Sequence, residues 1–293
     1  MTLLSRIGLG TVQFGQDYGV SNRRGKIPSD EAFEVLKLAH ENKVNLLDTA
    51  SSYGDAERVL GEFFKKHSLA FRVVTKLVLT DSYQKGMVHQ AYHQSLKQLN
   101  ISRAYGYLIH RFNDYVADPK IWEEMLELKK QGLVDKVGFS IYTPRELEIL
   151  WQHNVEMDLI QLPYSIFDRR FEKYFPELKQ RHVEIHARSV FLQGLAFMEA
   201  DTLPRHLKDA AGQLTQIQNM AVNCQASISA VCLNFVLLNP RIDQVILGID
   251  SLSHFQEDLK ATESFSRVQT VIEQLQNLSI ENEEVLLPYK WQK

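Results

Sequence analysis

The residues Val44-Asn45-Leu46-Leu47-Asp48-Thr49 form a short run that is largely apolar on both faces and ends in two polar side chains. Such a run is typical of a strand that is covered on both sides in a parallel sheet. After it, Ala56, Val59, Leu60 and Phe63 recur at a spacing that places them on one face of a helix. The stretch therefore predicts one strand–helix unit with polar groups where the strand ends.

The same unit recurs along the chain. Eight short runs predict strands, over Arg6–Thr11, Val44–Thr49, Phe71–Lys76, Ala104–His110, Val134–Ser140, Met157–Leu162, Val183–Ser189 and Gln244–Ile249. Eight units in one continuous alternation predict a (β/α)8 TIM barrel. A doubly wound open sheet is the alternative, but it normally has a glycine-rich turn that opens a helix after the first strand. Gly8–Gln13 lacks the third glycine of that turn, and we expect no helix there.

Helix positions follow from caps and apolar spacing. Ser29 is expected to cap the first helix, and Thr143-Pro144-Arg145-Glu146 is a capping box. Further helices are expected over Ser82–Leu99, Asp168–Gln180 and Ala226–Leu238, with the eighth near Ser251 or Ser253. Beyond the eight units we expect an extra helix over His206–Asn223, inside an insertion that spans Leu192–Gln225, and a C-terminal helix over Ser266–Leu278 with a tail. No linker divides residues 1–293, which predicts a single domain.

Composition excludes several classes of protein. The 293 residues are 44% hydrophobic and 24% charged, which excludes intrinsic disorder. A net charge of −3 supplies no basic field, so we expect no nucleic acid and no membrane as partner.

The N-terminus lacks the pattern of a signal peptide, and no apolar run reaches the roughly 20 residues of a membrane span. Cys224 and Cys232 lie eight residues apart in a segment with helical character, and at the rise of a helix they would be too far apart for a disulfide. The expected location is the cytoplasm.

The fold predicts where the chemistry lies, because TIM barrels carry their active sites at the carboxyl ends of the strands. The polar residues that end the runs are Thr11, Asp48, Thr49, Lys76, His110, Ser140, Gln161, Arg188 and Ser189. An acid, a lysine and a histidine are costly to bury in one place unless they pair. Their gathering at one mouth predicts a functional site. No metal cluster is expected.

The segment Leu47-Asp48-Thr49-Ala50-Ser51-Ser52-Tyr53-Gly54, with Thr75-Lys76 and Leu108-Ile109-His110, resembles the aldo-keto reductases. Further matches are Gly8-Leu9-Gly10-Thr11, Gly138-Phe139-Ser140, Gln161, Gly194 and Val245–Gly248, so the resemblance covers about Leu4 to Thr262. It implies that Asp48, Tyr53, Lys76 and His110 form a catalytic tetrad for carbonyl reduction by a nicotinamide dinucleotide.

Chemistry explains the tetrad. Reducing a carbonyl needs a hydride at carbon and a proton at oxygen, and Tyr53 is the expected proton donor. A tyrosine pKa near 10 is poorly matched to neutral pH. We expect Lys76 to lower the pKa of Tyr53 by stabilising the phenolate, and Asp48 to hold Lys76 and neutralise its charge. His110 would orient the carbonyl by a hydrogen bond or relay a proton.

The resemblance also implies a cofactor path. Ser140 and Gln161 would hold the nicotinamide carboxamide, Gly248 and the start of the eighth helix would face phosphate, and Glu257 and Asp258 correspond to a pair that contacts adenine. The remaining residues expected to touch cofactor are Gly10, Thr11, Asp48, Arg188, Ser189, Gln193, Gly194, Asp250 and Ser251.

The chain also departs from the family pattern. Ile141 replaces a common asparagine, and Arg188 replaces an aromatic residue that stacks on the nicotinamide. Asp250 stands where many members carry a base for the 2′-phosphate of NADPH. NADPH is the family's usual cofactor and is favoured over NADH, but Asp250 weighs against it.

The leading prediction is an NADP(H)- or NAD(H)-dependent reductase that acts on a small aldehyde or ketone, with a keto-sugar as one candidate. Two alternatives stay open. One is a non-catalytic nicotinamide-binding subunit or redox sensor on the same fold, and the other is an aldolase that uses Lys76 to form a Schiff base. We expect a monomer or a small homo-oligomer.

Overall fold

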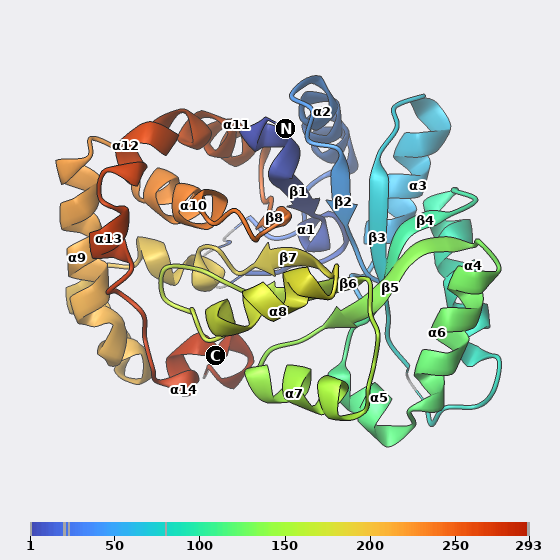
Figure 1. The fold of residues 1–293 in the computed structure, drawn as a ribbon. Helices are drawn as coiled ribbons and strands as arrows, with labels where there is room; N and C mark the ends of the chain where they lie inside the picture. The colour runs from blue at the N-terminus through green and yellow to red at the C-terminus, as the bar shows by residue number, and fades with distance from the viewer. Residues whose placement is uncertain (1, 20–21, 23, 80, 292–293) are drawn as a thin grey trace.

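Eight parallel strands close into one barrel in the computed structural model, which describes residues 2–19, 22, 24–79 and 81–291 (Figure 1). The strands are β1 (Ile7–Gly10), β2 (Leu46–Asp48), β3 (Arg72–Leu77), β4 (Ala104–Ile109), β5 (Val134–Ser140), β6 (Leu159–Pro163), β7 (Glu184–Arg188) and β8 (Gln244–Gly248). They pair in sequence order, and β8 closes on β1 with Gly10 opposite Gly248. The prediction of a single (β/α)8 domain is confirmed.

Helices surround the barrel, as the amphipathic stretches predict. Those described are α1 (Val12–Gly15), α2 (Ser29–Glu41), α3 (Ala56–Lys66), α4 (Met87–Leu99), α5 (Phe112–Ala117), α6 (Lys120–Lys130), α7 (Pro144–Gln152), α8 (Phe175–Gln180), α9 (Ala211–Asn223), α10 (Ile228–Leu238), α11 (Leu252–Ala261), α12 (Phe265–Gln269), α13 (Ile272–Leu275) and α14 (Glu283–Leu286). Thr143 and Glu146 form the predicted capping box, and Ser251 caps α11. In the described ranges no single helix is long and apolar enough to cross a membrane.

Three predicted helices are shorter or broken in the structure. The helix expected from Ser82 begins only at Met87, because Gly86 takes a positive φ of 92° just before it. Asp168–Gln180 does not form one helix: buried Asp168 pairs with Arg170, and only Phe175–Gln180 is α-helical. Ser266–Leu278 is split into α12 and α13, where the Thr270 hydroxyl donates to the Arg267 carbonyl oxygen at 2.6 Å and competes with the helical bonds.

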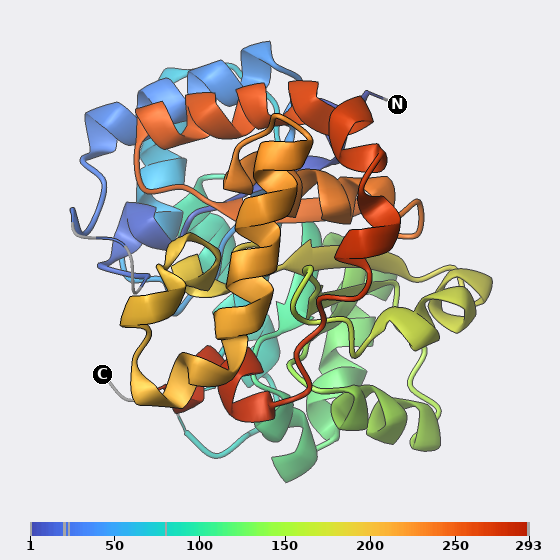
Figure 2. The same ribbon diagram turned by 90° about the vertical axis from the view of Figure 1, so that its left-hand side faces the viewer.

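The extra segments cross one side of the barrel. Part of the helix expected over His206–Asn223 is a 3₁₀ helix at Arg205–Ala210, and α9 follows it. Figure 2 shows α9 along the outside of the molecule, with the chain between α13 and α14 beside it. The tail then brings Pro288 and Tyr289 to the mouth of the barrel, where they line its main pocket.

A short helix follows β1, contrary to the expectation that none opens there. This single turn, α1, lies against the loop that carries Tyr53. The Asp55 N–H donates to the Gly15 carbonyl oxygen at 3.3 Å, and a Cβ added to Gly15 would lie 1.7 Å from the Tyr53 carbonyl oxygen. Gly54, with a φ of +52°, makes the turn on the other side of this contact. The close approach of two backbones therefore fixes the position of Tyr53.

We predict that Gly15→Ala destabilises the protein by about 3 kcal/mol, because the new methyl group can be accommodated only by moving backbone. The matched control is Gly212→Ala: nothing lies within 4 Å of the added Cβ on α9, and a small stabilisation is expected. Urea denaturation measures both. Equal unfolding midpoints for the two variants would contradict this account of α1.

Candidate active site

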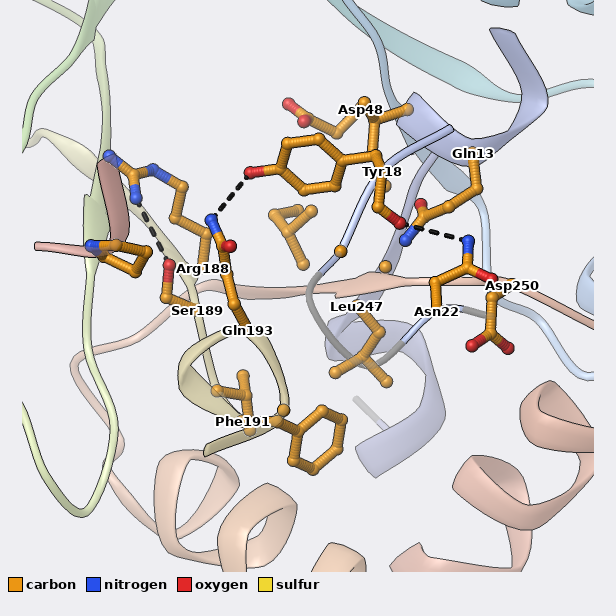
Figure 3. A pocket seen from close by; sticks show the side chains of 18 of the residues that line it. Gln13, Tyr18, Asn22, Asp48, Arg188, Ser189, Phe191, Gln193, Leu247 and Asp250 are labelled. Carbon is orange, nitrogen blue, oxygen red and sulfur yellow. Dashed lines mark hydrogen bonds between the residues drawn. The ribbon is translucent and has the colours of Figure 1, made fainter. Parts of the chain in front are cut away.

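A pocket of about 800 Å³ opens at the carboxyl ends of the strands, and Figure 3 shows part of its lining. This is within the range of small-molecule and cofactor sites. The lining includes most of the residues expected from the sequence: Gly10, Asp48, Tyr53, His110, Ser140, Gln161, Arg188, Ser189, Gln193, Gly194, Gly248, Asp250, Glu257 and Asp258. Three expected residues lie behind this surface: Lys76 supports Asp48 and Tyr53, Thr11 donates to the Asp48 carbonyl oxygen, and Ser251 caps α11.

The Lys76 ammonium group is the centre of the site. Its Nζ donates to Asp48 Oδ2 at 2.6 Å, to the Thr49 carbonyl oxygen at 3.0 Å and to the Tyr53 hydroxyl oxygen at 3.3 Å. The side chain is fully buried. These three acceptors use the three donors of an ammonium group. The strands β2 and β3 thus hold Asp48 and Lys76 in contact, and the loop after β2 brings Tyr53 to them.

Burial decides the proton affinities in this group. Burial, with the Asp48 charge as a second cause, raises the pKa of Tyr53, and Arg188 only partly opposes the shift. The net shift is opposite to the expected lowering of the pKa of Tyr53. Burial also lowers the pKa of Lys76, although Asp48 opposes this change. Tyr53 is therefore a protonated phenol at neutral pH, with a cation 3.3 Å from its oxygen.

His110 follows β4 and lies beside Tyr53, with the ring centroids 5.5 Å apart. Burial, aided by the positive charges of Lys76 and Arg188, lowers the pKa of His110 to about 3. Its Nδ1 is 3.2 Å from the Ser52 hydroxyl, which leaves Nε2 for a ligand. His110 is therefore neutral at physiological pH and suited to a hydrogen bond with a carbonyl oxygen.

Asp48 is held from a second side. The Gln161 amide Nε2 donates to Asp48 Oδ1 at 2.7 Å, and the Ser140 hydroxyl is 3.5 Å from Gln161 Oε1. Both residues line the pocket, as expected of groups that hold a carboxamide. In this structure, however, the Gln161 amide donor serves Asp48. Gln161 is thus a positioning residue for the acid as well as a candidate ligand contact.

Arg188 ends β7 inside the pocket. Its guanidinium lies 4.0 Å from the centroid of the Tyr142 ring and donates to the Ile141 carbonyl oxygen at 2.9 Å. The Tyr289 ring, from the C-terminal tail, packs edge-on against Tyr142 at 5.2 Å. Across the described part of the chain, Arg188 has no carboxylate partner within ion-pair distance. By contrast Arg111, at the start of α5, pairs with Asp114 and is not part of the described pocket lining.

Acidic residues gather at the opposite end of the pocket, which we call the α11 end and define by Asp250, His254, Glu257 and Asp258. Asp250 pairs with His254. Asp258 is 8% exposed, and burial, with the charges of Asp250 and Glu257, raises its pKa to about 7. The first backbone N–H of α11 already has an acceptor within the chain, because the Leu252 N–H donates to a Glu31 carboxylate oxygen at 3.0 Å.

Sequence reasoning missed Gln13 on α1, which lines the α11 end near Gly248. Its side chain is 7% exposed, and Oε1 has no hydrogen-bond partner among the described residues. Asn22 also lines the pocket, and across its mouth the Gln193 amide Nε2 donates to the Tyr18 hydroxyl oxygen at 3.1 Å (Figure 3). No spacing signal in the sequence marks Gln13 or Asn22, since only the closed barrel places the segment after β1 against β8. A buried amide oxygen that faces the cavity fits a donor group on a ligand.

The comparisons with known proteins agree with this geometry. The uncharacterized oxidoreductase YqkF of Bacillus subtilis is 22% identical, over 94% of this chain and 92% of its own. The NADH-specific methylglyoxal reductase of Escherichia coli is 23% identical, over 88% of this chain and 90% of its own. A crystal structure of an aldo/keto reductase from Klebsiella pneumoniae with NADP and acetate superposes with a TM-score of 0.67 at 20% identity, covering 94% of this chain and 93% of that one. The sequence model of the Aldo/keto reductase family matches residues 6–280. The chain therefore belongs to the aldo/keto reductase family, whose members include oxidoreductases that use nicotinamide cofactors.

Proposed function

We propose that this protein reduces an aldehyde or a ketone to an alcohol, with Tyr53 as the proton donor. The observation that carries the proposal is the contact of the Tyr53 hydroxyl with the buried Lys76–Asp48 pair at 3.3 Å. A nicotinamide dinucleotide, NADPH or NADH, would supply the hydride. The pocket offers it Ser140 and Gln161 at one end and the unpartnered Gln13 Oε1, in the described structure, at the other.

Each residue of the site has a separate role in the proposed reduction. Tyr53 is kept protonated by its burial, so a proton is available at its oxygen. As that proton moves to the carbonyl oxygen, negative charge develops on the phenol, and the Lys76 ammonium beside it stabilises that charge. Asp48 and Gln161 hold Lys76 and the acid in place, and neutral His110 donates from Nε2 to orient the carbonyl.

The same geometry weighs against the alternatives. A Schiff-base aldolase needs a free amine that reaches the substrate, whereas Lys76 is fully buried and uses its donors on Asp48, Thr49 and Tyr53. A sensor without catalysis has no need of a buried acid–lysine–tyrosine chain, which is costly to bury. We also propose that the enzyme works in the cytoplasm as a monomer or a small homo-oligomer.

The substrate is proposed to carry hydroxyl groups or an anionic group near its carbonyl, a keto-sugar being one candidate. Arg188 supports this, because it is half-buried beside the reaction centre and, within the described residues, is held by neutral groups. A guanidinium left in that state is an anchor for an anion or for hydroxyl oxygens.

We predict that Tyr53→Phe lowers kcat for aldehyde reduction by roughly 100- to 10,000-fold, because the only group lost is the proton donor. The Kd for the dinucleotide is expected to change by less than about twofold. It is measured by the quenching of protein fluorescence. Tyr105→Phe is the matched control, because its hydroxyl contacts Glu184 near the amino end of β4. A Tyr53→Phe enzyme with the activity of the control variant would rule out this assignment.

His110 is predicted to stay neutral from pH 8 down to about pH 5, because burial and the neighbouring cations lower its pKa to about 3. Nitrogen chemical shifts of the imidazole ring measure this directly. The signal is assigned with His110→Asn, and exposed His254 serves as an internal comparison. A titration of His110 near pH 6.5 would contradict the described environment.

Arg188→Met is predicted to raise KM for glyoxylate about tenfold or more, and KM for the neutral glycolaldehyde by less than about threefold. Arg145→Met, on the outer surface of α7, is the control and should leave both values unchanged. An equal loss for both substrates would show that Arg188 does not recognise substrate charge.

A further inference from the structure

The α11 end of the pocket has a charge pattern that bears on which dinucleotide can bind. The Tyr53–Lys76 contact defines the reaction end, so a dinucleotide with its nicotinamide there must place its adenosine half toward the far end of the same pocket. Four carboxylates lie at that far end: Asp250, Glu257 and Asp258 in the lining, and Glu31 on the first N–H of α11. The α11 end of the pocket is therefore rich in acidic side chains.

The bases of this region are already paired. Arg24 donates to both oxygens of Glu31, at 3.1 and 2.9 Å, and His254 pairs with Asp250. These pairs leave Glu257 and Asp258 without a basic partner in the described parts of the chain. Asp258 is 8% exposed and has no hydrogen-bond donor among the described residues, although it faces the cavity. Burial and the charges of Asp250 and Glu257 already raise the pKa of Asp258 to about 7, so an additional dianion would meet like-charge repulsion or force Asp258 to take up a proton.

The N-terminus of α11 offsets little of this charge. A helix N-terminus attracts phosphate through its free N–H groups and its positive dipole end. Here the Leu252 N–H donates to Glu31, and the His254 N–H donates to the Ser251 hydroxyl oxygen at 3.1 Å. Two of the first three N–H groups of α11, and the positive end of its dipole, therefore already serve groups of the chain itself.

Two buried groups at the same end instead fit uncharged donors. Gln13 Oε1 is buried without a hydrogen-bond partner in the described structure, and the carboxyl group of Asp258 lines the same part of the cavity. Asp250 adds a third acceptor group. A ribose hydroxyl or an exocyclic amine donates to such acceptors, whereas a phosphate monoester is an acceptor at neutral pH.

We propose that the α11 end selects a dinucleotide with a free 2′-hydroxyl on its adenosine ribose, so that the protein binds NADH in preference to NADPH, with Asp250 and Asp258 as the specificity-determining residues. This inference rests on the proposed function, and it reverses the preference that the family resemblance favours. The substituent that distinguishes the two dinucleotides carries negative charge, so discrimination arises from like-charge repulsion.

The test is equilibrium binding of NADH and NADPH to the full chain, measured by calorimetry without a carbonyl substrate. We expect the Kd for NADPH to exceed that for NADH by about tenfold or more at low salt, and the ratio to shrink as salt is added. Asp250→Asn and Asp258→Asn are each expected to narrow the ratio at least about threefold. Glu263→Gln, an exposed acid just beyond α11, is the matched control and should leave the ratio unchanged.

The outcomes separate the two proposals. Equal or tighter binding of NADPH by the wild-type chain overturns the inference and leaves the reductase assignment intact. A ratio that neither Asp250→Asn nor Asp258→Asn narrows, with folding confirmed by circular dichroism, also overturns it. Failure of both dinucleotides to bind overturns the proposed function, and the cofactor preference with it.

Discussion

The buried ammonium group of Lys76 imposes the constraint on which the site depends. A charge with no solvent exposure inside a barrel must be matched by partners in good geometry, or it destabilises the fold. Asp48 supplies the opposite charge, and the Thr49 carbonyl and the Tyr53 hydroxyl take the other donors. The pairing of β2 with β3 and the course of the loop after β2 are therefore coupled to the protonation of Tyr53. The same contacts that satisfy the charge also hold the phenol that we propose as the proton donor.

The backbone around Tyr53 is as closely determined as the side chains. Gly15 and Gly54 let α1 and the β2–α3 loop approach until no room remains for a Cβ. Gln161, from β6, holds Asp48 from across the barrel at 2.7 Å. Residues from three separate parts of the chain thus restrict one phenol, which is the kind of support that catalytic groups need to be preorganised.

Charge is distributed unevenly along the pocket. Arg188 places at one end a guanidinium that has no carboxylate partner among the described residues, whereas Asp250, Glu257 and Asp258 place three carboxyl groups at the other end. Such a layout orients a long ligand as well as binding it, because a group placed at the wrong end meets repulsion. It also explains why a mild net charge of −3 says little about this protein's ligands. The sum over 33 basic and 36 acidic residues does not record where in the fold they lie.

Most of the barrel was predictable, because continuous apolar runs such as Leu46-Leu47 are unusual outside strands covered on both faces. Errors fell where local chemistry overrides periodicity: the buried Asp168–Arg170 pair and the Thr270 hydroxyl interrupt stretches that have helical spacing. The sequence by itself determined the strand order, the placement of Asp48, Lys76 and His110 at strand ends with Tyr53 close by in the chain, and the acid at position 250. Only the tertiary structure decided that Gln13 faces the cavity, that Glu31 occupies the start of α11, and that burial raises the pKa of Tyr53 and lowers that of His110. Proton affinities and charge balance depend on desolvation and on distances between residues far apart in the chain, and those exist only once the barrel has closed.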